Sequence, residues 1–324
     1  MTGYPGWLTN RFLETLEDYS MPFDSIRCLT ERRCDPPVVK CVPAETVTGN
    51  LLDPAALDRA TRNQDIVMHA AGVLHVKRIG DFYKINRDGT AKLLEASVRN
   101  GVRRFVYIST NAAQGFCQGR GHELDESGPC HPESHYGKSK RQAEEAVQFY
   151  GETGKIETVI LRPAMFYGPP VPVRHLEIFR KIRKGFFYVF GTGDYLRSIT
   201  YIDNLIQGIH LAIQKPEAVG QTYYIADREI PTLNDIVRSI AHAMGTEVKI
   251  IRLPEWMAYG ARWLDETIAA CNRYWMLPHI VGESCKNIAC RITKAEKELG
   301  YNPTVSFREG YVKTIAWCRE QGLL

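Results

Sequence analysis

The sequence predicts an α/β protein with a doubly wound parallel sheet, followed by a smaller and mostly helical lobe. Over the first two-thirds of the 324 residues, short apolar runs alternate with amphipathic segments, and this rhythm loosens after about Pro169. Alternating strands and helices form a parallel sheet that helices cover on both faces. We therefore expect one domain over residues 1–169 and a second lobe over residues 170–324, with some of the second lobe's chain returning to the sheet.

Each expected element rests on its own periodicity. Short apolar runs bounded by turn residues predict strands at 25–29, 65–70, 105–109, 158–161, 187–190 and 222–225. Apolar residues at helical spacing predict helices at 8–17, 54–62, 81–100, 136–153, 175–184, 204–214, 233–244 and 254–271.

Composition excludes several classes of protein. The formal charge of +4, without a dense basic run, gives no sign of a nucleic-acid partner. No apolar run reaches the roughly 18 residues of a transmembrane helix, and the first residues do not resemble a signal peptide. The nine cysteines are scattered and never form a C-x-x-C pair, so neither a metal site nor a disulfide framework is expected. Reduced cysteines predict a cytoplasmic location.

Two glycines at the start of the chain suggest a phosphate-binding turn. Gly3 and Gly6 directly precede a helical pattern, where backbone N–H groups at a helix start can approach a pyrophosphate. The third glycine of the dinucleotide fingerprint is replaced by Thr9. Two nearby glycines are also compatible with an ordinary loop.

The end of the next strand bears on the choice between NAD and NADP. Enzymes that use NAD usually carry an acidic residue there for the ribose hydroxyls, but this position holds Thr30. Glu31 comes one residue late, and Arg32 and Arg33 follow where a 2′-phosphate would lie. The sequence therefore favours NADP, with a solvated loop as the alternative role for both arginines.

A catalytic pair is predicted at the start of the helix at 136–153. Tyr136 and Lys140 are four residues apart and share one helix face. A phenol with a pKa near 10 is a poor base at neutral pH, and a neighbouring ammonium favours its phenolate. Such a phenol can exchange a proton with a substrate oxygen while hydride moves to or from nicotinamide. The strand at 105–109 ends in two hydroxyls, Ser109 and Thr110, one of which would orient the same oxygen.

In this order, the motifs resemble those of the extended short-chain dehydrogenases/reductases, the NAD-dependent epimerase/dehydratase family, almost from end to end. The start resembles TGxxGxxG, residues 69–72 (HAAG) the motif after the fourth strand, and residues 85–90 (INRDGT) the VNxxGT helix. Residues 105–115 (FVYISTNAAQG) resemble FVYxSSxxVYG, and residues 161–169 (LRPAMFYGP) resemble LRPxxVYGP. Residues 197–204 and 293–303 resemble the family's RxxxYVDD and SKAxxxLGWxP segments.

The resemblance implies a Rossmann NAD(P)-binding domain and a substrate-binding lobe. It assigns catalysis to Tyr136, Lys140 and Thr110, with Lys140 also holding the nicotinamide ribose and Asn86 supporting the site. The cofactor-binding residues it implies are Gly3, Gly6, Trp7, Leu8, Arg32, Asn50, Leu51, Ala70, Ala71, Gly72, Asn86, Ser109, Tyr136, Lys140 and Pro163.

Departures from the family pattern limit the reactions and substrates that we expect. Dehydratases carry Asp-Glu after the catalytic Thr, but Asn111 and Ala112 stand there. Met165 replaces the substrate-binding Asn of many epimerases, as in the 3β-hydroxysteroid dehydrogenase-like branch, and suggests either an apolar substrate or core packing. Arg197 would bind a substrate phosphate or pair with Asp203 or Asp194.

We therefore expect an NAD(P)-dependent oxidoreductase that acts on a secondary alcohol or ketone of a small molecule. The alternatives are a nucleotide-sugar 4-epimerase with tightly held NAD and a non-catalytic nucleotide sensor, against which the intact catalytic residues argue. The resemblance also implies a homodimer through the helices at 81–100 and 136–153. The first of these carries Leu93, Leu94 and Val98 at helical spacing, a stripe that would otherwise cover the sheet.

The beginning of the chain departs from the expected fold. The first strand of a doubly wound sheet is central and should supply about five or six apolar residues before the glycine turn. Only Met1 and Thr2 precede Gly3. Either the native chain begins several residues earlier, which we favour because the later motifs are intact, or the sheet has a gap and cofactor binding is weak.

Overall fold

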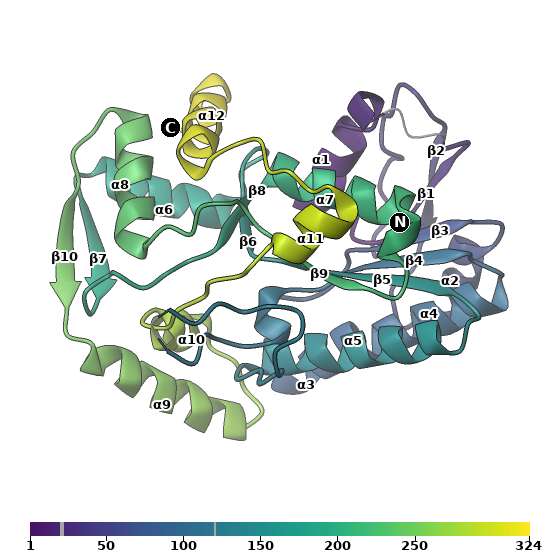
Figure 1. Cartoon of the computed structure of the whole chain (residues 1–324), viewed down its shortest axis with the longest axis horizontal. Coiled ribbons are helices and arrows are strands. Elements are labelled where there is room, and N and C mark those ends of the chain that lie inside the picture. The colour runs from purple at the N-terminus through teal and green to yellow at the C-terminus, as the bar shows by residue number, and fades with distance from the viewer. Residues whose placement is uncertain (20–22, 120) are drawn as a thin grey trace.

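The computed structural model describes residues 1–19, 23–119 and 121–324 and has the expected α/β architecture, with helices on both faces of a parallel sheet (Figure 1). The strands are β1 (Ile26–Thr30), β2 (Ala44–Thr48), β3 (Ile66–His69), β4 (Arg104–Ile108), β5 (Glu157–Pro163), β6 (Met165–Tyr167), β7 (Phe186–Phe190), β8 (Ile199–Tyr201), β9 (Thr222–Ile225) and β10 (Lys249–Leu253). The α-helices are α1 (Trp7–Glu14), α2 (Pro54–Thr61), α3 (Ile79–Phe82), α4 (Gly89–Arg99), α5 (His135–Glu152), α6 (Val173–Arg183), α7 (Ile202–Gln214), α8 (Leu233–Met244), α9 (Trp256–Ala270), α10 (Met276–Glu283), α11 (Thr293–Leu299) and α12 (Phe307–Glu320). A π-helical segment, η2 (Tyr83–Asp88), joins α3 to α4.

The main sheet is parallel throughout. Strands β3, β4, β5 and β9 are neighbours in that order, and β1 pairs with β2. Single bridges from Thr2 to Leu29 in β1 and to His69 in β3 join the two parts. The order β2-β1-Thr2-β3-β4-β5-β9 is therefore that of a doubly wound sheet, in which ligands bind at the carboxyl ends of the strands.

The central position of the sheet is held by the first two residues. Thr2 donates its backbone N–H to the carbonyl of Met68 at 3.0 Å, and Leu29 donates to the carbonyl of Met1 at 2.9 Å. The amino group of Met1 donates to the carbonyl of Arg27 at 2.6 Å. A cavity of about 590 Å³, lined by Met1, Ile26, Ile66 and Met68 among others, lies beside this segment.

Two apolar layers sandwich the sheet. On one face, Leu8 and Phe12 of α1 pack with Leu205 and other side chains of α7. On the other face, α2, α4 and α5 bury a second cluster that includes Leu93 and Leu94. The stripe of Leu93 and Leu94 therefore covers the sheet, and the predicted homodimer would need other side chains of α4 and α5.

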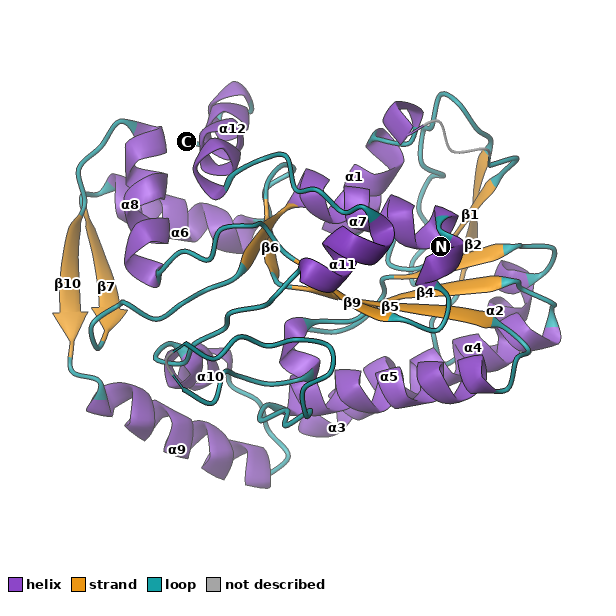
Figure 2. Cartoon of the chain, in the orientation of Figure 1, coloured by secondary structure: helices purple, strands orange, loops and turns teal. Residues whose placement is uncertain are grey.

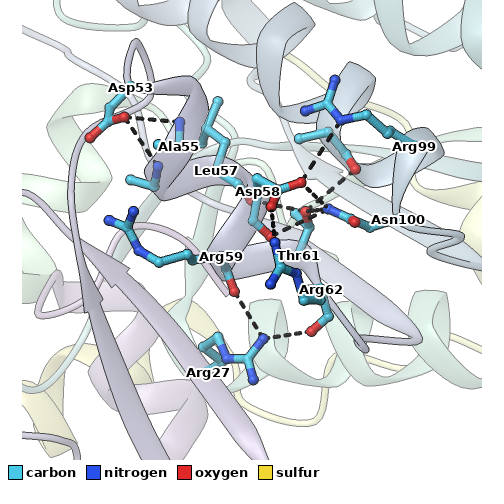
Figure 3. A network of polar contacts seen from close by, with 12 residues as sticks. Arg27, Asp53, Ala55, Leu57, Asp58, Arg59, Thr61, Arg62, Arg99 and Asn100 are labelled. Carbon is cyan, nitrogen blue, oxygen red and sulfur yellow. Dashed lines mark hydrogen bonds and ion pairs between the residues drawn. The ribbon is translucent and has the colours of Figure 1, made fainter.

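Polar contacts fix α2 beside the sheet (Figure 3). The carboxylate of Asp53 caps the helix by accepting hydrogen bonds from the backbone N–H groups of its first turn. Asn100, at the end of α4, donates to the Asp58 carboxylate at 3.1 Å, and Arg27 of β1 donates to the carbonyl of Arg62 at 2.6 Å. These bonds hold the loop before α2, which carries Asn50 and Leu51, next to the carboxyl end of β1.

From β6 onward the chain contains more strands than the sequence analysis expected. Two parallel pairs, β6 with β8 and β7 with β10, accompany helices α6, α8 and α12 (Figure 2). Helices α9 and α10 form a closely packed pair, because a Cβ atom placed on Gly282 would lie only 3.0 Å from the Cα of Arg262. Within the described residues, no helix is long and apolar enough to cross a membrane.

Candidate active site

A cavity of about 880 Å³ opens at the carboxyl ends of β1, β3 and β4, between the first loop and α5. Every residue that the sequence analysis assigned to the cofactor lines this cavity except Asn86. Glu31 and Arg33, which the sequence analysis discussed for the ribose end of the cofactor, also line the cavity. The sequence analysis did not anticipate Cys34, Gly49, Val73, Leu74, Ile85, Ile108, Phe166 and Arg174.

The glycine loop allows close approach of backbone to a ligand. Gly3 has a φ of +95°, and a Cβ atom there would lie 3.1 Å from the backbone of Ala70 and Ala71. A Cβ atom on Gly6 would lie 2.4 Å from the carbonyl oxygen of Gly3. Thr9, in place of the third glycine, donates its hydroxyl to the carbonyls of Gly3 and Gly6 at 2.9 and 3.0 Å. Thr9 thus stabilises the glycine loop through these two hydrogen bonds.

Trp7 leaves one polar atom without a protein partner. Its indole Nε1 is buried and has no hydrogen-bond acceptor within the described chain, while its ring centre lies 4.6 Å from that of Phe166. A buried donor left unpaired costs about 1–3 kcal/mol. The first turn of α1 contains no acidic residue to repel an anion. The loop, the helix start and this unpaired donor together fit a dinucleotide.

A buried histidine joins the glycine loop to the loop after β3. The Nδ1 atom of His69 lies 2.7 Å from the hydroxyl of Thr2, and its Nε2 atom lies 2.9 Å from the hydroxyl of Thr90. Burial lowers the pKa of His69 well below its usual value, so the ring is neutral. The Thr2 hydroxyl also accepts the N–H of Ala71 at 3.1 Å. These hydrogen bonds connect the start of the glycine loop to the loop after β3.

Asn86 lies behind the cavity and holds its wall. Its side-chain oxygen accepts the N–H of Val73 at 2.8 Å, and its amide nitrogen donates to the Val73 carbonyl at 3.1 Å. The same nitrogen donates to the hydroxyl of Ser139 in α5 at 3.0 Å. Asn86 thus ties the loop that carries Ala70, Ala71 and Gly72 to α5.

Tyr136 and Lys140 lie in the first turns of α5, whose N-terminus is capped by the Ser134 hydroxyl. Burial raises the pKa of Tyr136 to about 12, although a hydrogen bond with Thr110 lowers it. The Lys140 ammonium donates to the carbonyl of Ile108 at 2.8 Å, and burial lowers its pKa to about 7. Burial, and not a neighbouring ammonium, therefore has the largest effect on the phenol in this arrangement.

We expect Lys140 to make the stability of the cofactor-free protein depend on pH. Its folded-state pKa of about 7 lies below the unfolded value of 10.5, so the unfolded chain binds more protons between these values. The free energy of unfolding should therefore rise between pH 7 and 10 in the parent relative to Lys140→Met, which keeps the apolar stem. Thermal unfolding of both proteins across this range measures the difference. A difference in Tm that stays constant from pH 7 to 10 would contradict the buried environment of Lys140.

A buried ion pair lies directly behind this pair. The Glu144 carboxylate accepts hydrogen bonds from Arg162 at 2.7 and 2.9 Å and from the Ser109 hydroxyl at 2.6 Å. Arg162 also donates to the side-chain oxygen of Gln114 at 3.0 Å, which accepts the Tyr224 hydroxyl as well. Gln114, whose role the sequence did not reveal, links strands β4, β5 and β9 beneath the site.

A second cavity of about 850 Å³ meets the first at Tyr136. One part of its wall is apolar and is formed by Ile79 and Phe82 of α3 with Ala269 and Tyr274. The rest of the lining carries charged side chains, namely Glu133, Lys138, Arg262, Asp265 and Glu266. Sequence reasoning missed this cavity because its walls come from segments almost 200 residues apart. Arg174 of α6 was also missed, because it precedes the helix expected at 175–184 and no local pattern marks it as a residue of the site.

The two residues expected to contact substrate lie elsewhere. Met165 is 54% exposed and lines neither cavity, so the core-packing alternative is wrong. Arg197 donates to the backbone carbonyls of Glu283 and Ser284 at 2.9 and 2.6 Å. Its predicted ion pair with Asp203 or Asp194 is wrong, because Asp203 pairs with Arg11 and Asp194 accepts a bond from Asn234. Arg197 therefore anchors the end of α10. The described residues contain no group of three or more His, Cys, Asp or Glu side chains arranged to hold a metal ion.

Comparisons with known proteins identify the family of this chain. The family model of the NAD dependent epimerase/dehydratase family matches residues 1–226. Protein y4nL of Sinorhizobium fredii is 33% identical over 99% of this chain and 95% of its own. The N-acetyl-α-D-glucosaminyl-diphospho-ditrans,octacis-undecaprenol 4-epimerase of Escherichia coli O157:H7 is 26% identical over 78% of this chain and 74% of its own. The structure of MoeE5 in complex with UDP-glucuronic acid and NAD shares the fold with a TM-score of 0.77, at 20% identity over 99% of this chain and 98% of its own. The chain belongs to the NAD-dependent epimerase/dehydratase family and is an NAD-dependent enzyme of the extended short-chain dehydrogenase/reductase type.

Proposed function

We propose that this enzyme transfers hydride between a nicotinamide cofactor in the 880 Å³ cavity and a secondary alcohol or ketone in the 850 Å³ cavity. The observation that carries this proposal is the position of Tyr136, which lines both cavities. A proton donor at the junction of two binding spaces is what hydride exchange between two bound molecules requires. The apolar wall formed by Ile79, Phe82 and Tyr274 favours a substrate with substantial apolar surface.

The residues around Tyr136 have separate tasks in this mechanism. The nicotinamide ring, when bound, accepts or provides the hydride. Tyr136 exchanges a proton with the substrate oxygen, and Thr110, which lines neither cavity, acts through its hydrogen bond with the phenol. Lys140 is placed to donate hydrogen bonds at the base of the cofactor cavity and to supply positive charge when protonated.

The proposal is tested by incubating the purified enzyme with NAD(P)H and ketones or sterols of increasing apolar area while nicotinamide absorbance is followed. We expect the enzyme to reduce an apolar ketone. Adding the corresponding alcohol at a saturating concentration should inhibit this turnover. Absence of cofactor turnover with all ketones and alcohols, together with release of tightly bound NAD on denaturation, would contradict it.

Tightly bound NAD without cofactor turnover would favour a nucleotide-sugar 4-epimerase. The similarity to an epimerase of E. coli supports this alternative, as do Arg262 and Lys138, whose cationic side chains line the second cavity and suit a substrate diphosphate. An epimerase returns the hydride to the same substrate, so its cofactor stays bound and no net nicotinamide change appears. Interconversion of UDP-glucose and UDP-galactose, followed by chromatography, distinguishes the two.

We further propose a preference for NADP. Thr30 is buried at the end of β1, whereas Arg32 and Arg33 are exposed on the wall of the cofactor cavity and form no ion pair with a described residue. We expect a higher kcat/KM with NADP(H) than with NAD(H), and a loss of about tenfold for NADP(H) alone in Arg32→Ser/Arg33→Ser, since one charged hydrogen bond contributes about 1.5–3 kcal/mol. Arg183→Ser, an exposed arginine on α6, is the matched control. A clear preference for NAD in the parent would mean that both arginines face solvent only.

A further inference from the structure

Helices α9 and α10 carry a surface of exposed apolar side chains that the rest of the described chain does not cover. Only one of the fifteen residues of α9, Ala258, is buried. Trp256, Trp263 and Trp275 are 69%, 66% and 55% exposed. Together with Tyr259, Leu277 and Ile280, which are also more than half exposed, they form what we call the hairpin surface. Figure 1 shows α9 along the lower margin of the molecule, away from the sheet.

The contacts that hold α9 in place involve a different side of the helix from the one that carries the exposed aromatic side chains. Trp256, Tyr259 and Trp263 follow helical spacing and share one side of α9. A different side of α9 packs on α10, where the Asp265 carboxylate lies 2.9 Å from Nδ1 of His279. The helix is therefore held in place while its tryptophans face outward, an arrangement that costs free energy in water unless another apolar surface covers it.

Positive charge lies at the tip of the same hairpin. The backbone N–H of Tyr274, in the turn between α9 and α10, donates to the carbonyl of Lys77 at 3.3 Å, and that of Ile79 donates to the carbonyl of Asn272 at 3.4 Å. Lys77, Arg78 and Arg273 are thus brought together at the tip. All three are exposed and have no ion-pair partner among the described residues, whereas Asp265 and Glu266 of α9 pair with His279 and Arg262.

We propose that the hairpin surface docks the enzyme on an anionic lipid bilayer. Tryptophan and tyrosine are enriched where protein meets the bilayer interface, and unpaired Lys and Arg beside them add attraction to anionic headgroups. Helix α9 also lines the second cavity through Arg262, Ala269 and Ala270. A bilayer on the hairpin surface would therefore lie next to the proposed substrate cavity, so an amphiphilic substrate would reach Tyr136 without leaving the interface.

Vesicle binding by the full chain tests the proposal. Three of the five tryptophans lie on the hairpin surface, so intrinsic fluorescence reports its environment. With phosphatidylglycerol vesicles we expect co-sedimentation and a blue shift of the emission, with much weaker binding to phosphatidylcholine vesicles and at high salt. Trp263→Glu/Trp275→Glu and, separately, Lys77→Glu/Arg78→Glu should each weaken binding about tenfold or more. Val312→Glu and Lys155→Glu, exposed positions on α12 and after α5, are the matched controls and should bind as the parent does.

Two results would overturn the proposal. One is the absence of co-sedimentation with anionic vesicles, or sedimentation that neither hairpin variant weakens relative to the controls. The other is a parent that ignores vesicles but sediments as an oligomer that Trp263→Glu/Trp275→Glu dissociates, since the surface would then bind a second copy of the chain. Because both hairpin variants change exposed side chains outside the cofactor cavity, retained NAD(P) affinity verifies that they are folded.

Discussion

Replacing Tyr136 by Phe should lower kcat by about 10² to 10⁴ and leave the dissociation constant of the cofactor within about twofold of the parent. The substitution removes the hydroxyl that Thr110 contacts and that both cavities share, but it keeps the ring and its packing. Stopped-flow or steady-state turnover, together with a fluorescence titration of NAD(P)H, measures the two effects separately.

Tyr188→Phe is the matched control, because this tyrosine is 51% exposed on β7 and lines neither cavity. It should turn over substrate at the parental rate. If Tyr136→Phe retains activity within a factor of two of the parent, Tyr136 has no part in proton transfer and the proposed function fails with it.

The second large effect is expected on stability. Glu144→Gln should lower the free energy of unfolding by about 3–5 kcal/mol, because it leaves the Arg162 guanidinium buried without an opposite charge. Burial alone would lower the pKa of Arg162, but its bonds to Glu144 raise it above the ordinary value, so the guanidinium stays charged. Urea denaturation of the cofactor-free protein provides the measurement.

Replacing both Glu144 and Arg162 distinguishes the loss of the ion pair from the cost of leaving one charge unpaired. Glu144→Leu/Arg162→Met removes both charges and should recover much of the lost stability, since well-packed apolar side chains often replace a buried ion pair without net cost. Lys313→Met removes the half-exposed pair between Lys313 and Glu309 and should cost about 0–1 kcal/mol. A single Glu144→Gln variant as stable as Lys313→Met would show that the buried charge is compensated by other groups.

Elements with strong local signals were predicted closely from the sequence. The helix expected at 233–244 is α8 to the residue, because Thr232 and Asp235 form a capping box and Gly245 ends it in the left-handed conformation. The pairs β6–β8 and β7–β10 were incompletely predicted. Strands of three residues, and an edge such as β10 that is only partly buried, carry too few apolar positions to show a period of two.

The residues of the site also differ in how well the sequence predicts them. Tyr136 and Lys140 are one helical turn apart, so their spacing alone places both on the same face of α5. Arg174, Phe82 and Tyr274 reach the site only through tertiary packing, and no local pattern distinguishes them from surface or core residues. The same holds for Gln114, which lies in the segment after β4 and meets Arg162 of β5 only in the folded chain.

The number of residues in the π-helical segment η2 matters for the site, because it determines where Asn86 points. Asn86 reaches both Val73 and Ser139 from within this wide turn, which accommodates one more residue than an α-helical turn would. Loss of a single residue from η2 would let the segment wind as a regular α-helix while the flanking turns keep their alignment, so the side chains within the wide turn, Asn86 among them, would change direction. The backbone would remain a good helix, yet Asn86 would no longer align with the loop after β3. In this part of the molecule, substitutions can be tolerated where deletions cannot, because the number of residues in η2 determines how Asn86 meets the loop after β3.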